Sequence, residues 1–321
     1  MPGSGTRTFL DPAQYEASLR QAHIDLVLTC GGEFQARLTW AELHRMQLLR
    51  CEEDAARIGL VSFAAPLTFI SFPAASAAMP VWRGTEMQAR DLVFHSLGDR
   101  LHQTTSGASG WSVIALHPGQ LEEYGRVLSE KPLPPPRQGR VLRLASRDAV
   151  RLRRLHAQAC RLAETRPKIL THPEVARAIE QGLIHALVPS LVGAKVQKDG
   201  AVQRHHARIM VRFEEVLTER LDQPLRMLEL CELIGVSEPI LRSCCAKFLG
   251  VTPNRYALLR RLKQVRSALR EADPDHADVA QLARRFGFTE LGRFAGEYRA
   301  VFGETPSATL QRAADPRFSR S

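Results

Sequence analysis

Cysteine and histidine are the side chains whose chemistry is easiest to recognise from spacing alone. None of the six cysteines shows the CxxC or Cys/His spacing of a zinc site: Cys30, Cys51, Cys160, Cys231, Cys244 and Cys245. His95, His102 and His117 lack the HxH spacing, with a nearby Glu, of a histidine–carboxylate metal site. There is also no GxSxG elbow and no P-loop. We therefore expect buried free thiols, no metal, no cofactor and no catalytic centre.

A run of basic residues in the last third of the chain suits binding to a polyanion. Between Pro239 and Arg270 there is no Asp or Glu, whereas eight side chains are basic: Arg242, Lys247, Arg255, Arg260, Arg261, Lys263, Arg266 and Arg270. A basic helix is often only a solvated face, but arginine also pairs with guanine and with phosphate. The formal net charge of +10 is spread over both halves of the chain, so this local run carries the signal.

The basic run lies beside a sequence unit that occurs twice. LELCELIGVSEPILRSCCAKFLGVTP matches VAQLARRFGFTELGRFAGEYRAVFGETP, with Gly235 opposite Gly287 and Ser237 opposite Thr289. Each copy reads as a short helix, a glycine turn, a Ser/Thr N-cap whose oxygen accepts a backbone hydrogen bond, and a second helix. This order predicts two helix-turn-helix units.

A longer helix is predicted between the two units. Thr252 would cap it, Pro253 would take its first position, and it would end before Asp273-Pro274. Its apolar stripe consists of Tyr256, Leu259, Leu262, Val265 and Leu269. Such a stripe predicts an amphipathic helix.

Residues from about Arg208 to Arg312 resemble the DNA-binding domain of the AraC/XylS family. The resemblance rests on LxxLCELIGVS, LGVTPNRYALLRRLKQVRSAL and VAQLARRFGFTELGRFAGEYRAVFGETPSATL. It implies that two helix-turn-helix units enter successive major grooves on one face of DNA, roughly 34 Å apart. It also implies a cytoplasmic, sequence-specific transcription regulator whose partners are double-stranded DNA and RNA polymerase.

The family's roles can be carried over residue by residue. The first recognition helix would run from Glu238 to Phe248 and the second from Glu290 to Val301, with Arg242 as the main base-reading side chain. We expect phosphate contacts from the arginines at 255, 260 and 299. The complete set of expected DNA-binding residues is Ser237, Glu238, Arg242, Ser243, Arg255, Arg260, Thr289, Leu291, Gly292, Arg293 and Arg299.

Some residues depart from the family pattern. Pro239 removes a donor from the first turn of recognition helix one, and Cys245 replaces a common aromatic. In recognition helix two, Gly292 and Gly296 each cost about 1 kcal/mol of helix stability. We therefore expect the first unit to dominate sequence reading.

The N-terminal half reads as strands followed by helices. Asp11-Pro12 predicts a short helix, and from about residue 23 to 117 short β-rich runs (VSF, LTFISF, LVFH, WSVIAL) predict a small barrel or sandwich. The uncharged stretch 58–82 is long enough to span a membrane, but its three prolines favour buried strands. Beyond the proline-rich spacer 131–139, helices are predicted over 146–164 and 171–188.

These elements predict an α+β chain of two domains. A strand-rich, barrel- or cupin-like sensor domain with a helical pair would occupy residues 1–200, and an all-α double helix-turn-helix domain would occupy 201–321. Residues 195–200 are the expected linker. The helical pair could form a homodimer or simply cover the β-domain, and we expect a homodimer.

The resemblance implies a small-molecule effector bound in the N-terminal domain. The closing segments also resemble the ethanolamine-utilisation regulator branch, which suggests a small amine or a cobalamin, although no individual residue specifies either. A ligand-independent architectural DNA binder is the alternative, and the large strand-rich domain argues against it. A methyl-transfer repair protein also joins this DNA-binding domain to reactive cysteines, but the required cysteine cluster is absent.

Overall fold

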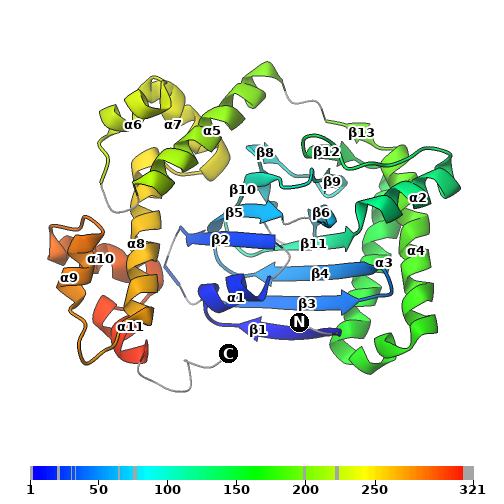
Figure 1. The fold of residues 1–321 in the computed structure, drawn as a ribbon, viewed down its shortest axis with the longest axis horizontal. Coiled ribbons are helices and arrows are strands. Elements are labelled where there is room, and N and C mark those ends of the chain that lie inside the picture. The colour runs from blue at the N-terminus through cyan, green and yellow to red at the C-terminus, as the bar shows by residue number, and fades with distance from the viewer. Residues whose placement is uncertain are drawn as a thin grey trace.

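The structure, a computed structural model, describes residues 3–19, 22–29, 31–32, 34–63, 66–74, 78–197, 200–220 and 224–313. Within these residues the chain forms two antiparallel sheets, one of eight strands and one of five, together with eleven α-helices. The sheets occupy the middle of the molecule, with α2–α4 on one side and α5–α11 on the other (Figure 1).

The two sheets are built from short strands joined by turns. In spatial order, the eight-stranded sheet contains β1 (Gly5–Phe9), β3 (Ala36–Glu42), β4 (Met46–Glu53), β11 (Ser109–Leu116), β6 (Thr68–Pro73), β9 (Asp91–Phe94), β12 (Arg140–Arg143) and β13 (Lys195–Val196). The five-stranded sheet contains β2 (Ala22–Leu28), β5 (Arg57–Phe63), β10 (Arg100–Thr105), β7 (Val81–Trp82) and β8 (Thr85–Glu86). Strands β6 and β11 are buried along their whole length, and their sequences, TFISFP and SGWSVIAL, are correspondingly rich in apolar residues.

The helical pair covers the outer face of the eight-stranded sheet. It consists of α3 (Ser146–Thr165) and α4 (Pro173–Val192), joined by the 3₁₀ helix η1 (Pro167–Thr171) and flanked by α2 (Pro118–Ser129). Leu152 and Leu183 on these helices pack with Ile70 and Ile114 of the sheet in one apolar cluster. Both predicted helices are confirmed, and the pair serves at least to cover the β-domain.

A buried polar cluster fills part of the space between the two sheets. The Arg57 Nε donates to Glu53 Oε2 at 2.6 Å, and both side chains are 1% exposed. Tyr15, from α1 (Pro12–Ser18), donates its hydroxyl to Glu53 Oε1 at 2.8 Å, and Trp111 Nε1 donates to the same oxygen at 3.1 Å. A buried ion pair with these additional donors joins both sheets to α1.

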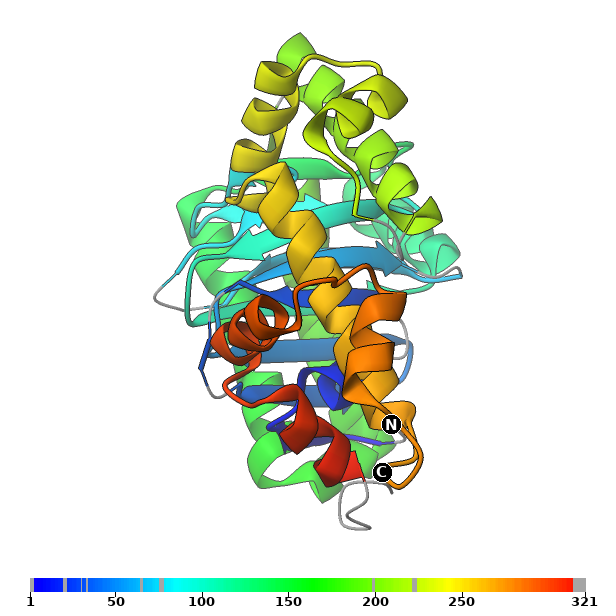
Figure 2. The same ribbon diagram turned by 90° about the vertical axis from the view of Figure 1, so that its left-hand side faces the viewer.

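The remaining helices form the region that faces the viewer in Figure 2. They are α5 (Ala201–Glu219), α6 (Met227–Ile234), α7 (Glu238–Leu249), α8 (Pro253–Glu271), α9 (Val279–Arg285), α10 (Leu291–Phe302) and α11 (Pro306–Ala313). The long helix α8 runs from the α6–α7 group to the α9–α11 group. Phe213 and Val265 belong to the same apolar cluster as Ile24 and Leu101 of the five-stranded sheet, so this region packs closely against the N-terminal half.

The expected fold class, a strand-rich N-terminal half and an all-α C-terminal region, is confirmed, and the strands form two packed sheets. The uncharged stretch 58–82 forms β5, β6 and β7. In the part of the chain that the structure describes, no helix combines the length and the apolar character needed to cross a bilayer.

Candidate nucleic-acid interface

The two repeated sequence units fold into two helix-turn-helix units with matching turns. In the first, between α6 and α7, Gly235 has φ of +77° and the Val236 N–H donates to the Cys231 carbonyl at 3.1 Å. In the second, between α9 and α10, Gly287 has φ of +76° and the Phe288 N–H donates to the Ala283 carbonyl at 3.1 Å. Glycine is needed at both turns because residues with a Cβ rarely adopt this left-handed backbone.

The repeat continues beyond the recognition helices α7 and α10. Gly250 and Gly303 end these helices at φ of +71° and +70°. Thr252 then accepts a hydrogen bond from the Arg255 N–H at 3.3 Å to cap α8, and Thr305 accepts from the Ala308 N–H at 3.2 Å at the start of α11. The predicted cap and the predicted stripe of α8 are both confirmed, since its five stripe residues are buried.

The expected N-caps of the two recognition helices are wrong in part. Ser237 occupies the N-cap position of α7, but its side chain accepts no hydrogen bond there. The N-cap of α10 is Glu290 rather than Thr289, so this helix begins one residue later than expected, and it too has no side-chain cap bond. The first backbone N–H groups of both helices therefore lack a side-chain acceptor among the described residues.

Most of the expected base-reading residues lie on exposed surface. Arg242 is half exposed, and its guanidinium forms a 2.7 Å ion pair with Glu238 one turn earlier on α7. Leu291 is half-buried at the start of α10, where it contributes to the apolar core. The other residues expected to face the groove are exposed, namely Ser237, Ser243, Thr289, Gly292 and Arg293, and so is Arg299, the expected phosphate contact.

The structure separates the two arginines of α8 that were expected to contact phosphate. Arg255 is partly exposed and pairs at 2.6 Å with Glu297 of α10, so it joins the connecting helix to the second recognition helix. Arg260 is only 6% exposed, and its guanidinium is held by the buried carboxylate of Glu214. Arg260 would have to abandon this partner to reach DNA, so its assignment as a phosphate contact is corrected.

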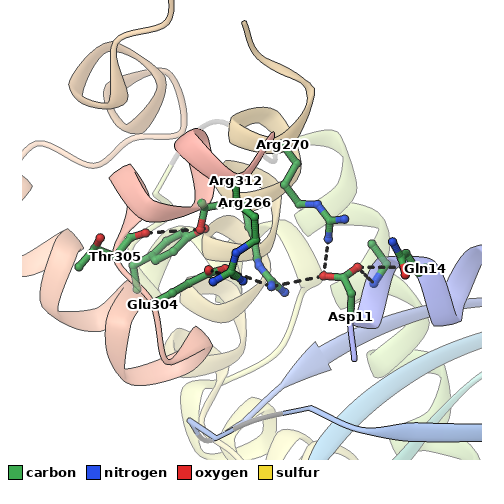
Figure 3. A network of polar contacts seen from close by, with 10 residues as sticks. Asp11, Gln14, Arg266, Arg270, Glu304, Thr305 and Arg312 are labelled. Carbon is green, nitrogen blue, oxygen red and sulfur yellow. Dashed lines mark hydrogen bonds and ion pairs between the residues drawn. The ribbon is translucent and has the colours of Figure 1, made fainter. Parts of the chain in front are cut away.

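The acid-free basic run has a second role that the sequence did not indicate. Lys263 of α8 forms ion pairs with Glu16 and Asp25, which belong to the N-terminal half. Arg266 and Arg270, one and two turns further on, both pair with Asp11 at the N-cap of α1 (Figure 3). The basic face of this part of α8 is therefore directed at the strand-rich N-terminal half and not at an external polyanion.

Most of the residues considered for metal or thiol chemistry lie in the protein interior, whereas His117 is exposed at the N-cap of α2. Cys51, Cys160, Cys231, Cys244 and Cys245 are buried as free thiols, and Cys30 falls outside the described residues. Burial raises the pKa of the Cys160 thiol to about 12. Across the described ranges, no group of three or more His, Cys, Asp or Glu side chains is arranged to hold a metal ion.

A helix-turn-helix family model matches the C-terminal region, and several known proteins match part of the chain. The model, described as "Helix-turn-helix domain", matches residues 230–312. The "Probable thc operon regulatory protein" of Rhodococcus erythropolis is 37% identical over 97 residues, which cover 30% of this chain and 29% of that protein. The "XylDLEGF operon transcriptional activator" of Pseudomonas putida is 29% identical over 131 residues, which cover 41% and 40% of the two chains.

Among solved structures, a "probable AraC family transcriptional regulator" from Rhodopseudomonas palustris is 31% identical and covers 33% of this chain and 98% of that chain, with a TM-score of 0.31. The chain thus spans well under half the length of the two curated relatives.

Proposed function

The chain belongs to the AraC/XylS family of regulators through its helix-turn-helix region, and on this premise we propose that it is a transcription regulator that binds specific DNA sequences. The observation that carries the proposal is the pair of matched helix-turn-helix units on one connecting helix. Two such units suit successive major grooves on one face of the duplex.

Arg242 is proposed as the main base-reading residue. Its ion pair with Glu238 is exposed, and an exposed pair at this spacing contributes only about 0.3–0.5 kcal/mol. A bidentate contact between arginine and guanine contributes about 1–3 kcal/mol of discrimination. The contact with DNA is therefore the stronger of the two, and Arg242 can exchange one for the other at little cost. Ser243 lies beside it on the exposed face of α7.

For the second unit, the residues proposed to face the DNA bases are Arg293 and Gly292 of α10, together with Thr289 and Leu291 at its start. Arg299 is proposed to contact phosphate from the same helix. The N-termini of α7 and α10 support this orientation, because their first N–H groups have no side-chain cap and can donate to phosphate oxygens.

Control by a small-molecule effector is proposed for the N-terminal half. The support is the resemblance together with the direct ion pairs between that half and α8, through which a bound ligand can influence the helix-turn-helix units. Homodimer formation and contact with RNA polymerase are proposed from the resemblance. Activation is proposed because the Pseudomonas putida relative is named as a transcriptional activator.

The experiment is selection of bound DNA sequences from a random pool, carried out with the wild type and with Arg242→Ala. We expect the variant to lose its preference at one base pair and to bind the selected site about 5- to 150-fold more weakly. Arg126→Ala is the matched control, since Arg126 forms an exposed pair with Glu122 at the same i,i+4 spacing on the distant helix α2. An Arg242→Ala profile identical to the wild type would reject the assignment of Arg242.

A further inference from the structure

A cavity of about 760 Å³ lies where the strand domain meets the DNA-binding region. Its walls come from β5 and β10 of the five-stranded sheet, from α5, and from the end of the recognition helix α7. This volume is within the range of roughly 300–1,000 Å³ that is typical of small-molecule sites. It is therefore large enough to hold a metabolite in contact with both halves of the protein.

The cavity carries an excess of positive charge. Within the described part of the chain, its lining has two glutamates and five arginines: Arg83, Arg100, Arg204, Arg208 and Arg212. A neighbouring cavity of about 520 Å³ shares Arg83 and Arg204 and adds Arg137, Arg140 and Asp99, and the Asp99 carboxylate pairs with Arg83. Guanidinium groups that converge on a concave, partly apolar site concentrate anions there and can bind carboxylate or phosphate bidentately.

Both glutamates of the lining already have partners. The Glu215 carboxylate pairs with Arg212 at 3.1 Å on the surface of α5. The Glu214 carboxylate lies deeper, 2.7 Å from His102 Nε2, and also binds two side chains of α8. Neither carboxylate is available to neutralise Arg100 or Arg208, which are both exposed.

Part of the lining is apolar. Leu60 and Leu101 come from the sheet, Met210 from α5 and Phe248 from α7, and each is at most 6% exposed. Gly84, at the tip of the β7–β8 hairpin, lies against the Phe248 ring, where an added Cβ would be 2.8 Å from Cδ2. This wall suits an apolar ligand body beside the arginines, whereas the small amine suggested by the family resemblance would be repelled by them.

We propose that this cavity is the effector site and that it binds an organic anion, a carboxylate or a phosphate monoester with an apolar body. This inference rests on the proposed function, because an effector needs a regulator to act on. An occupant would lie against His102, whose Nε2 is 2.7 Å from the Glu214 carboxylate, and Glu214 binds Tyr256 and Arg260 of α8. Occupancy is thereby transmitted to the helix that holds the two helix-turn-helix units.

The first test measures binding of anilinonaphthalene sulfonate, a fluorescent organic anion with an apolar body, to the full-length protein. We expect one saturable site that octanoate or octyl phosphate displaces and that neutral octanamide does not, and the stronger of the two competitors identifies the headgroup. The double variant Arg100→Gln/Arg208→Gln should weaken binding by about tenfold or more. The matched control, Arg147→Gln/Arg151→Gln, removes two exposed arginines from the distant helix α3 and should bind like the wild type.

Three outcomes would overturn the site: equal weakening in the two double variants, displacement by octanamide as effective as by octanoate, or displacement by duplex DNA alone. Ala207→Phe, which places a ring in the cavity from α5, gives a second check that keeps the charges intact and should abolish binding. Circular dichroism and urea unfolding establish that each variant is folded.

The second test measures DNA affinity with and without the displacing anion. We expect saturation to shift the Kd of the wild type by about threefold or more and to leave Ala207→Phe unchanged. An unchanged wild-type Kd would contradict the assignment as effector site. If the protein binds specific DNA but no anion, this inference alone is refuted. If it binds the anion but no specific DNA, the proposed function is refuted.

Discussion

Glu214 is a buried residue that joins the two halves of the molecule. Its carboxylate lies 2.7 Å from His102 Nε2 of β10 and accepts hydrogen bonds from Tyr256 and Arg260 of α8. Burial by itself would raise the pKa of Glu214, but the hydrogen bond and charge of His102, the Arg260 guanidinium and the Tyr256 hydroxyl outweigh it and lower the pKa to about 2. The group is therefore a buried carboxylate that stays ionised.

Replacing this carboxylate without changing its size should be costly. We expect Glu214→Gln to lower the free energy of unfolding by about 3 kcal/mol or more, because Arg260 would keep a buried charge without its partner. Urea unfolding at neutral pH measures the loss. Glu215→Gln is the control on the same helix, and since its partner Arg212 is exposed, a change within about 0.5 kcal/mol is expected.

The difference in the free energy of unfolding between the wild type and Glu214→Gln should depend on pH. A carboxyl whose pKa falls from 4.5 in the unfolded chain to about 2 in the folded protein stabilises the fold above pH 4.5 and loses that contribution as the pH drops toward 2. The stability gap between wild type and Glu214→Gln should narrow as the pH falls from about 4.5 toward 2. A gap that widens on acidification would contradict this role for Glu214.

For individual residues, the sequence predicted which kinds of side chain the functional region contains better than it predicted which of them are exposed. Arg242 and Arg260 both lie in the acid-free run, yet one is half exposed and the other is 6% exposed. The difference arises because Glu214, 46 positions earlier, faces only one of them. No local pattern marks that pairing, since Glu214 reads as one of two adjacent acidic residues on an amphipathic helix.

Among the elements, α10 combines a functional position with weak helix formers. Gly292 and Gly296 are exposed, and a Cβ added to either would meet nothing within 4 Å. Neither glycine is therefore required by a turn or by close packing. Both lower the stability of a helix whose first turn also lacks a side-chain cap.

Substitution by alanine should stabilise this element. We expect Gly292→Ala and Gly296→Ala each to raise the free energy of unfolding by about 1 kcal/mol, as measured by urea unfolding. Gly303→Ala, at the end of the same helix, should lower it by about 1 kcal/mol, because its φ of +70° disfavours any residue with a Cβ. Destabilisation by all three substitutions would show that α10 is constrained by contacts other than helix propensity.

Element boundaries were predictable where the chemistry is local. Thr252 and Pro253 fixed the start of α8, and Gly235 and Gly287 fixed the two turns, because each acts on its own backbone. The caps of the recognition helices were predicted less well. Thr289 was expected to cap by its residue type, but the helix begins one position later, after Glu290.

For the molecule as a whole, charge divides between an internal and an external face. The internal face is the set of α8 side chains paired with Asp11, Glu16 and Asp25, all within the first 25 residues of the chain. Burial alone would raise the pKa of Asp11, but the hydrogen bond and charge of Arg270 and the charge of Arg266 lower it. The three carboxylates could not be assigned to α8 from sequence because the partners are 238 to 259 positions apart in the chain.

The division predicts which basic residues contribute to the salt dependence of DNA binding. Arg299→Ala should reduce the slope of log K against log salt concentration by about 1, the value for one lost phosphate contact. Lys263→Ala should leave that slope unchanged, because its ammonium group is committed to Glu16 and Asp25. Fluorescence anisotropy of a labelled duplex at several salt concentrations measures both. A smaller slope of log K against log salt concentration for Lys263→Ala would show that Lys263 of the internal face contacts DNA.

The hairpin tip at Arg83 and Gly84 has a consequence for protein engineering. Gly84 leaves no room for a methyl group beside Phe248, and Gln203 of α5 donates to the Arg83 carbonyl, so this turn is fitted to helices that follow it by more than a hundred residues. A chimera that joins this N-terminal half to the DNA-binding helices of a relative would keep the Arg83–Gly84 turn but lose the α5 and α7 side chains that pack against it. To exchange the N-terminal half between relatives, the β7–β8 hairpin, α5 and α7 would therefore have to be taken from the same protein.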